Sequence, residues 1–298
     1  MLKVYVGDAR EQLKKIESNS IQTIITSPPY LNLRHYSNSP LEIGREETIE
    51  EYINNLLTVF KECYRVLKDT GSFFLNIGDH YYSGTKVNGW QRPKQLMLVP
   101  QRVAIRLQED GWVLRNQIAW IKESAAVQPA ADRLSPSWEP IFYFAKTETT
   151  DFDPYQVGEP LKANTIQRAL YDLNRDESTV KDKTRANIRK RSAEKALSQE
   201  HPKSFPRDFW KIPVGMTRGD LEHTAIFPIE IPRRCILLSS KVGDTILDPF
   251  CGTATTLEAA RELNRNAIGI ELNEKYLADI KKRLNLNEQL VNEVEIIK

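Results

Sequence analysis

The segment Gly243–Thr256, with the sequence GDTILDPFCGTATT, is followed by Ala267–Glu271, AIGIE. An apolar run ends at Asp248, a turn of small residues follows, and helical spacing begins near Thr255. The second apolar run also ends in a carboxylate, Glu271, 23 positions after Asp248. This spacing is close to that of nucleotide-binding βαβ units, in which an acid after the second strand accepts hydrogen bonds from ribose hydroxyls. The segment therefore predicts a nucleotide-binding α/β fold.

The turn after Asp248 differs from a dinucleotide-binding loop, because it lacks the GxGxxG pattern and has one glycine, Gly252. Asp248 and Phe250 stand where a pyrophosphate needs bare backbone amides. An acid at this place suits a ligand with positive charge, such as a sulfonium that also carries an α-amino group. S-adenosylmethionine therefore fits these residues better than NAD. The alternative is structural, with Gly252 serving only as a tight turn and Glu271 only as a cap for a following helix.

Strands and helices alternate through most of the chain, which is typical of a doubly wound and mostly parallel sheet that binds ligands at the carboxyl ends of its strands. Alternating or buried apolar runs predict strands at Leu2–Val6, Ser20–Thr26, Ser72–Ile77, Trp112–Ile121, Ile141–Ala145, Thr245–Leu247 and Ala267–Ile270. Helical spacing predicts helices at Glu46–Leu67, Pro93–Gln108, Pro228–Ser239, Thr255–Leu263 and Glu274–Leu290.

Composition excludes several classes of protein. The 298 residues are 40% hydrophobic and 28% charged, enough to bury a sizeable core. No run of 18 apolar residues and no basic-then-apolar leader is present, so neither a membrane span nor a signal peptide is expected. The three cysteines are far apart, without a CxxC pair, and the four histidines show no HExxH spacing. We therefore expect a protein of the reducing cytoplasm with no disulfide scaffold and no catalytic metal.

A basic segment interrupts the α/β pattern. From residue 151 to about 222 clear periodicity is lost, which indicates an insertion that is either functional or disordered. Between Lys181 and Arg218 there are 11 Lys/Arg against 4 Asp/Glu, whereas the remaining chain holds 31 basic and 36 acidic residues. A basic segment on an acidic body favours an extended anionic partner such as nucleic acid. The alternative is a solvated and partly flexible loop.

A second motif, Thr26-Ser27-Pro28-Pro29-Tyr30, directly follows a buried strand. Two prolines fix φ and remove two backbone donors, so the turn is rigid and presents carbonyl groups without competing N–H groups. The Ser27 hydroxyl and the Pro28 carbonyl can accept hydrogen bonds from an exocyclic NH2, while Tyr30 offers a face on which a planar base can stack. Such positioning would localise the lone pair of the amine for attack on a methyl group. The alternative is an ordinary Ser-Pro-Pro turn.

These residues resemble a known family, the S-adenosylmethionine-dependent DNA amino-methyltransferases, which methylate cytosine N4 or adenine N6 in DNA. Ser27–Tyr30 (SPPY) matches the family's catalytic tetrapeptide, [Ser/Asn/Asp]-Pro-Pro-[Tyr/Phe]. Asp248–Thr255 matches its cofactor motif, Asp-Pro-Phe-x-Gly-[Ser/Thr]-Gly-Thr, except that Ala254 replaces the second glycine. The order of the motifs, with the catalytic one first, resembles the family's β arrangement, a circular permutation of the usual methyltransferase fold.

The resemblance implies an α/β fold of the Rossmann-like methyltransferase type, with a catalytic half (1–150), a target-recognition insertion (151–222) and a cofactor-binding half (223–298). The implied catalytic residues are Ser27, Pro28, Pro29 and Tyr30. The implied residues for S-adenosyl-L-methionine are Asp8, His223, Phe227, Asp248, Pro249, Phe250, Gly252, Thr253, Thr255 and Glu271. Contacts with double-stranded DNA are expected from Arg34, His35, Lys183, Arg185, Arg189, Lys190 and Arg191, although each can equally be a solvated surface residue.

The target base follows from the first residue of the catalytic motif. Within the family a serine there goes mostly with cytosine N4, and Asp or Asn mostly with adenine N6, so Ser27 favours N4-methylcytosine, with N6-methyladenine as the alternative. Cytosine C5 methylation needs a thiolate, usually from a Pro-Cys pair, whereas Cys63, Cys235 and Cys251 follow other residues.

Two other classes of function are compatible with these motifs. One is a methyltransferase that acts on RNA or on a protein amide, and the other is a DNA-binding protein on a decayed scaffold. The intact Ser27–Tyr30 motif and both cofactor acids speak against decay. The family implies a restriction-modification system, with a restriction endonuclease acting on the same site as the partner, and a monomer or a homodimer.

Overall fold

The structure is a computed structural model that describes residues 1–32, 39–125, 127, 129–174, 183–198, 202–214, 228–284 and 294–297. The chain forms two compact units, Met1–Asp151 together with Asp208–Lys298, and Phe152–Arg207. None of the helices in the described ranges is long and apolar enough to cross a membrane.

One sheet organises the first unit, and in the described part of the chain it has nine strands. In spatial order these are β6 (Phe209–Lys211), β4 (Val113–Ile121), β5 (Trp138–Ala145), β3 (Leu67–Asn76), β2 (Ile21–Thr26), β7 (Thr245–Asp248), β8 (Asn266–Glu271), β1 (Leu2–Val6) and β9 (Val294–Ile297). Neighbouring strands pair in parallel, except that β5 is antiparallel to both β3 and β4.

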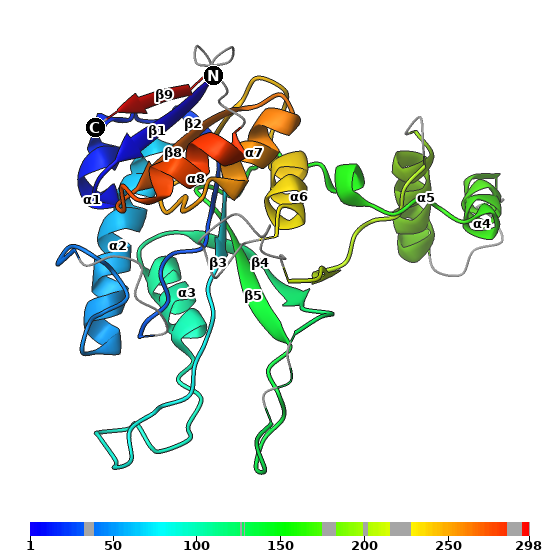
Figure 1. The fold of residues 1–298 in the computed structure, drawn as a ribbon. Helices are drawn as coiled ribbons and strands as arrows, with labels where there is room; N and C mark the ends of the chain where they lie inside the picture. The colour runs from blue at the N-terminus through cyan, green and yellow to red at the C-terminus, as the bar shows by residue number, and fades with distance from the viewer. Residues whose placement is uncertain are drawn as a thin grey trace. The chain divides into compact units, whose positions relative to one another are not determined.

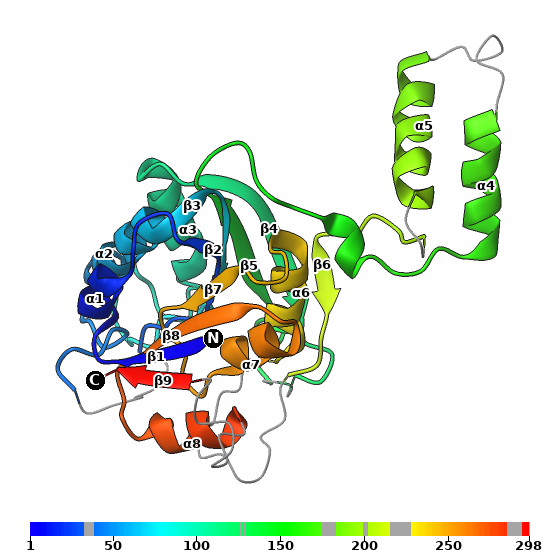
Figure 2. The same ribbon diagram turned by 90° about the horizontal axis from the view of Figure 1, so that it is seen from above.

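Helices cover both faces of this sheet (Figure 2). One face carries α1 (Ala9–Gln12), α2 (Ile49–Val66) and α3 (Val99–Glu109), and the other carries α6 (Glu230–Ser239), α7 (Thr255–Glu262) and α8 (Tyr276–Arg283). The doubly wound, mostly parallel α/β fold is thus confirmed. The N-terminal strand β1 lies between β8 and β9, so the chain's beginning completes the part of the sheet that ends in Asp248 and Glu271 (Figure 1).

Aromatic side chains fill the core beneath α2. Phe73 on β3 packs against the rings of Phe60, Trp112 and Phe144, with centroids 5.2, 5.0 and 5.9 Å away. The start of α2 is fixed by a capping box, in which Thr48 and Glu51 bond each other's backbone N–H groups. These contacts hold the helix against the strand that follows it.

Helix α3 is shorter than expected, because it begins at Val99 and not at Pro93. The Asp79 carboxylate accepts hydrogen bonds from the backbone N–H groups of Leu98 and Val99 (3.0 and 3.1 Å), which caps the helix at this point. Leu98 itself has a left-handed backbone, with φ of 54°, and this conformation ends any continuation toward Pro93. The part of the last expected helix beyond residue 284 lies outside the described residues.

The second unit contains two helices where the sequence showed no clear periodicity: α4 (Ala163–Asn174) and α5 (Lys183–Leu197) lie side by side (Figure 2). No side chain of α4, and only Ala193 of α5, is buried. Apolar periodicity is weak in α5, whereas Ile166, Leu170 and Leu173 of α4 do have helical spacing, which the sequence prediction overlooked. The boundaries also differ from the expected insertion of 151–222. Residues 208–214 belong to the first unit, where β6 pairs with β4.

Replacing Phe73 with alanine should lower the free energy of unfolding by about 3–5 kcal/mol, because the ring is fully buried among three other aromatic rings. Urea denaturation followed by circular dichroism measures this change. Val242→Ala is the matched control, because the Val242 side chain is 71% exposed and its truncation should change stability by no more than about 0.5 kcal/mol. Equal effects of the two variants would contradict this description of the core.

Candidate active site

A cavity of about 930 Å³ opens at the carboxyl ends of the parallel strands. Its walls come from the segments that directly follow β1, β2, β3, β7 and β8, and from residues 134–140 at the start of β5. This volume is large enough for a nucleotide-sized ligand. It lies where a doubly wound sheet is expected to bind its ligand.

Asp248, at the end of β7, is a buried carboxylate with three hydrogen-bond donors. The Thr26 hydroxyl donates to Oδ1 at 2.7 Å, the Thr256 hydroxyl to Oδ2 at 2.7 Å, and the Phe250 N–H to Oδ1 at 3.1 Å. Burial raises the pKa of Asp248 to about 6, and the three hydrogen bonds oppose that rise. Through these hydrogen bonds, Asp248 connects the end of the strand before Ser27 to the first turn of α7 at the cavity wall.

Glu271, at the end of β8, holds the turn between β7 and α7. Its two carboxylate oxygens accept hydrogen bonds from the N–H groups of Gly252 (2.9 Å) and Asn273 (2.8 Å). Burial raises the pKa of Glu271 to about 7, against the effect of these hydrogen bonds. A carboxylate has about four acceptor positions, so Glu271 can still accept hydrogen bonds from ligand hydroxyls.

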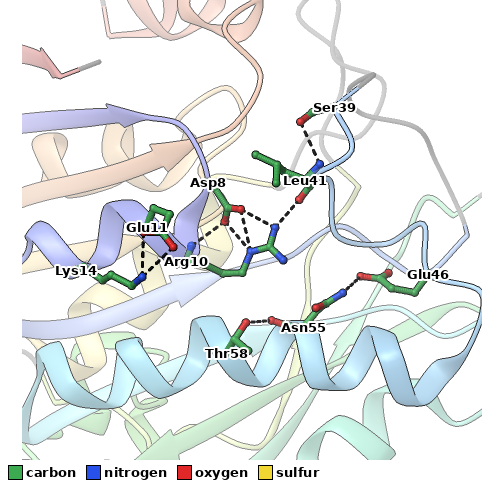
Figure 3. A network of polar contacts seen from close by, with 9 residues as sticks. All are labelled: Asp8, Arg10, Glu11, Lys14, Ser39, Leu41, Glu46, Asn55 and Thr58. Atoms are coloured by element: carbon green, nitrogen blue, oxygen red, sulfur yellow. Dashed lines mark hydrogen bonds and ion pairs between the residues drawn. The ribbon is translucent and has the colours of Figure 1, made fainter.

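Asp8, the third expected acid, also lies on the cavity wall, and its carboxylate is ion-paired with Arg10 (Figure 3). The two oxygens accept from Nε at 2.9 Å and from Nη2 at 2.6 Å, while Nη2 also donates to the Leu41 carbonyl at 3.0 Å. Arg10 thereby ties the end of β1 to the segment containing Leu41, which lines the cavity as well.

Contacts with Tyr52 of α2 and with Gly78 hold the Ser27–Tyr30 turn in place. The buried Tyr52 of α2 donates a hydrogen bond of 2.8 Å from its hydroxyl to the Pro29 carbonyl. A Cβ atom at Gly78 would lie 2.4 Å from the Tyr30 ring, so only glycine allows this ring its position. The turn is therefore rigid through its packing as well as through its prolines.

A polar network joins this turn to the neighbouring strands. The Ser27 hydroxyl lies within hydrogen-bond distance of the Tyr30 hydroxyl (3.1 Å) and of Asn76 Oδ1 (3.4 Å). Tyr30 and the Asn76 amide in turn donate to the carboxylate of Glu139, at 3.2 and 3.4 Å. A short ion pair links Glu139 to Lys122.

Asn76, Glu139 and Lys122 were given no individual catalytic or binding role from the sequence. Asn76 has a signal in the sequence, because it ends β3 directly before the Gly78-Asp79 turn, beside the strand that carries Ser27. Glu139 lies on β5 and Lys122 directly follows β4, the strand antiparallel to β5, and no spacing along the chain indicates that these two side chains meet.

The structure brings the expected catalytic turn and most of the expected cofactor residues into one cavity. Its lining includes Ser27, Pro28, Pro29, Tyr30, Asp8, Asp248, Pro249, Phe250, Gly252, Thr253, Thr255 and Glu271. The basic residues Lys183, Arg185, Arg189, Lys190 and Arg191 all lie on α5 of the second unit. Arg34, His35, His223 and Phe227 lie outside the described residues.

The chemistry of the described side chains narrows the reaction further. Cys63, Cys235 and Cys251 are buried, and burial raises the pKa of each thiol, which disfavours a thiolate nucleophile.

Ala254, which replaces a motif glycine, has a left-handed backbone with φ of 64° at the start of α7, so the loop keeps the conformation that glycine favours. Among the described residues, no three or more His, Cys, Asp or Glu side chains could together hold a metal ion.

A solved DNA methyltransferase has the same fold. The cytosine-N4-specific PvuII DNA methyltransferase superposes with a TM-score of 0.67 and 20% identity, over 99% of this chain and 94% of the other. The complex of M1.HpyAVI with SAM superposes with a TM-score of 0.55 and 18% identity, over 96% of this chain and all of the other. The fold and the cavity thus define a Rossmann-like domain of the methyltransferase type.

Sequence comparisons show the family. The family model described as DNA methylase (N6_N4_Mtase) matches residues 21–282. The type II methyltransferase M.SmaI of Serratia marcescens is 33% identical over 95% of this chain and 90% of its own length. M.Cfr9I of Citrobacter freundii, also a type II methyltransferase, is 32% identical over 92% of this chain and 84% of its own. The chain belongs to the DNA methylase family and is a DNA amino-methyltransferase of the restriction-modification type.

The raised pKa of Glu271 predicts a pH dependence of stability. Its pKa rises from the ordinary 4.5 to about 7 on folding, so the folded protein holds the proton more tightly than the unfolded chain does. The protonated carboxyl group therefore stabilises the folded state relative to the ionised one. This stabilisation is lost as the pH rises from about 4.5 to about 7. Relative to Glu271→Gln, the wild-type free energy of unfolding should fall over this range by up to about 3 kcal/mol, at about 1.4 kcal/mol per pKa unit.

Urea denaturation at pH 4.5, 6 and 8 measures this difference. The exposed Glu47→Gln is the matched control and should show no comparable change relative to the wild type. A difference between the wild type and Glu271→Gln that stays constant with pH would contradict the burial of this carboxylate.

Proposed function

We propose that this DNA amino-methyltransferase transfers a methyl group from S-adenosyl-L-methionine to the exocyclic N4 of a flipped cytosine. The observation that carries the proposal is the meeting of two motifs in one cavity, the Ser27–Tyr30 turn and the loop between Asp248 and Thr255. The Asp248 hydrogen bonds to Thr26 and Thr256 connect the two motifs directly.

The cofactor half of the cavity fits S-adenosyl-L-methionine. When bound, this cofactor supplies an electrophilic methyl group on a sulfonium sulfur. Asp248 and Glu271 provide negative charge that suits a cation, and Glu271 has acceptor capacity for ribose hydroxyls. Phe250 and Tyr276 add aromatic surface to the same wall. A solved complex of M1.HpyAVI, which shares this fold, contains SAM.

The catalytic half of the cavity suits a flat base with an exocyclic amine. The Ser27 hydroxyl and the Pro28 carbonyl would accept the two amine hydrogens, and the Tyr30 ring would support the base. Flipping the base out of the duplex costs a few kcal/mol. Direct transfer would break the sulfonium–methyl bond, leave S-adenosyl-L-homocysteine and form the nitrogen–methyl bond, and the nitrogen would release one proton to solvent. No covalent enzyme intermediate is needed, in agreement with the buried cysteines.

Cytosine N4 is favoured as the target by the serine at the first position of the catalytic motif. The solved structure that superposes with a TM-score of 0.67 is that of a methyltransferase named as cytosine-N4-specific. Adenine N6 is the alternative, because the matched family model spans both chemistries in its name.

The second unit, Phe152–Arg207, is proposed as the target-recognition region. Its helix α5 carries Lys183, Arg185, Arg189, Lys190 and Arg191, which is charge suited to phosphates. The proposed biological partner is a restriction endonuclease that cuts the same DNA site, and the proposal is supported by the restriction-modification type of the family, since relatives are named type II methyltransferases. The expected location of such an enzyme is the cytoplasm, and its assembly is either a monomer or a homodimer.

The decisive experiment incubates the protein with mixed-sequence double-stranded DNA and methyl-labelled S-adenosyl-L-methionine, followed by nucleoside mass spectrometry. N4-methylcytosine is expected, and N6-methyladenine would move the target to adenine. Ser27→Ala should lower kcat by about 100-fold, because one acceptor of the amine is lost, while cofactor affinity is unchanged. Full activity of Ser27→Ala would contradict the proposed role of this hydroxyl.

A second prediction concerns α5. Replacing Arg189 and Arg191 with glutamine should weaken binding to every DNA sequence alike and reduce the slope of log K against log salt by about 2, since each phosphate contact contributes about 1. Fluorescence anisotropy between 50 and 200 mM salt measures this slope. Replacing the exposed Lys61 and Glu50 of α2 with glutamine is the control for surface charge outside the second unit. An unchanged slope for the α5 variant would show that these arginines do not contact phosphates.

A further inference from the structure

Ser27 is a hydroxyl, which can donate a hydrogen bond as well as accept one. An exocyclic NH2 only donates its hydrogens to an acceptor, so Ser27 suits the amine only if its own proton points elsewhere. The structure contains the groups that direct this proton, and they extend from Ser27 to an ion pair on the two antiparallel strands β4 and β5.

Asn76 is the group whose orientation matters most. Its amide nitrogen lies 3.1 Å from the Pro140 carbonyl and 3.4 Å from a carboxylate oxygen of Glu139. A carbonyl and a carboxylate only accept hydrogen bonds, so the NH2 end of Asn76 must face them. The carbonyl end, Oδ1, is thereby turned toward the hydroxyls of Ser27 and Tyr30, at 3.4 and 3.1 Å.

Lys122 fixes the orientation of the Glu139 carboxylate. One oxygen of the carboxylate, Oε1, makes the short ion pair with Lys122. The other, Oε2, accepts from the Tyr30 hydroxyl at 3.2 Å and from Asn76. The side chains of Lys122 and Glu139 are only 20% and 18% exposed, so this pair acts with less screening than a surface ion pair.

We propose that Glu139, held by Lys122 and acting through Asn76, makes Ser27 a hydrogen-bond acceptor for the substrate amine. The Ser27 proton is directed toward Asn76 Oδ1 and the Tyr30 oxygen, so a lone pair of Ser27 faces the cavity. Glu139 and Asn76 are positioning residues, because they act on the substrate only through Ser27. This inference rests on the proposed function. In this arrangement the neutral Ser27 hydroxyl acts as a hydrogen-bond acceptor, as a carboxylate would without help from neighbouring groups.

The variant Glu139→Gln tests the polarity of the network. Its oxygen must turn toward Lys122, so its NH2 group faces the NH2 group of Asn76 and the Tyr30 hydroxyl. Turning the Asn76 amide over removes this conflict between donors at the cost of its hydrogen bond to the Pro140 carbonyl, and a turned Asn76 donates to Ser27. We expect kcat to fall at least about tenfold, which corresponds to about 1.4 kcal/mol, with cofactor affinity unchanged. The exposed Glu148→Gln is the matched control.

Binding without turnover gives a second readout. The probes are pairs of duplexes that differ only in the base at the methylated position. One duplex of the pair carries cytosine and the other uracil, or adenine and hypoxanthine if adenine is the target. The wild type should prefer the base with the amine, and Glu139→Gln should lose or reverse this preference, because Ser27 then offers its proton to a carbonyl. In a Ser27→Ala background, Glu139→Gln should change neither preference nor kcat.

Three results would overturn the inference. They are an unchanged kcat and base preference in Glu139→Gln, an equal loss in the Ser27→Ala background, and a loss that follows cofactor affinity or thermal stability. Absence of methylation by the wild type on any DNA would instead contradict the proposed function, so the two failures are distinguishable.

Discussion

The hydrogen bonds that Asp248 accepts from Thr26 and Thr256 are the contacts on which the site depends. Asp248 ends one strand, Thr26 ends the neighbouring strand, and Thr256 lies in the first turn of the helix after the cofactor loop. Burying a carboxylate is unfavourable, as the pKa of about 6 shows, but three donors make the position tolerable. The catalytic turn and the cofactor loop, 222 residues apart in sequence, are thereby fixed side by side.

The two halves of the cavity differ in how polar groups are satisfied. Around Asp248 and Glu271, threonine hydroxyls and backbone N–H groups bind the acids, and these donors belong to the rigid ends of strands and helices. Around Ser27, the partners are side chains on β3, β4 and β5, connected in a chain that ends in an ion pair. The first half holds two buried acids in fixed positions, whereas the second sets the direction of a single hydroxyl proton. A site of this kind performs catalysis by positioning and electrostatics.

Much of the fold and part of the site could be predicted from the sequence. Strands such as Leu2–Val6 and helices such as the one after Thr48 have clear periodicity and end in recognisable turns or caps. The start of α3 at Val99 could not be predicted, because the cap that fixes it comes from Asp79, before a long loop. In the second unit, α5 could not be predicted because it has little apolar periodicity, whereas the helical spacing of Ile166, Leu170 and Leu173 does indicate α4 and was overlooked.

By itself, the sequence determined the α/β class, the order of the two motifs and the acids that follow two of the strands, because these properties are local patterns of apolar, proline and acidic residues. The hydrogen bonds and the ion pair that connect Asn76, Glu139 and Lys122 to Ser27 are visible in the folded protein alone. The tertiary structure also showed that the Asp8 carboxylate is paired with Arg10 and that Asp248 fastens the two motifs together. The physical reason is that strand pairing and burial bring distant segments into hydrogen-bond distance, and neither leaves a periodic signal along the chain.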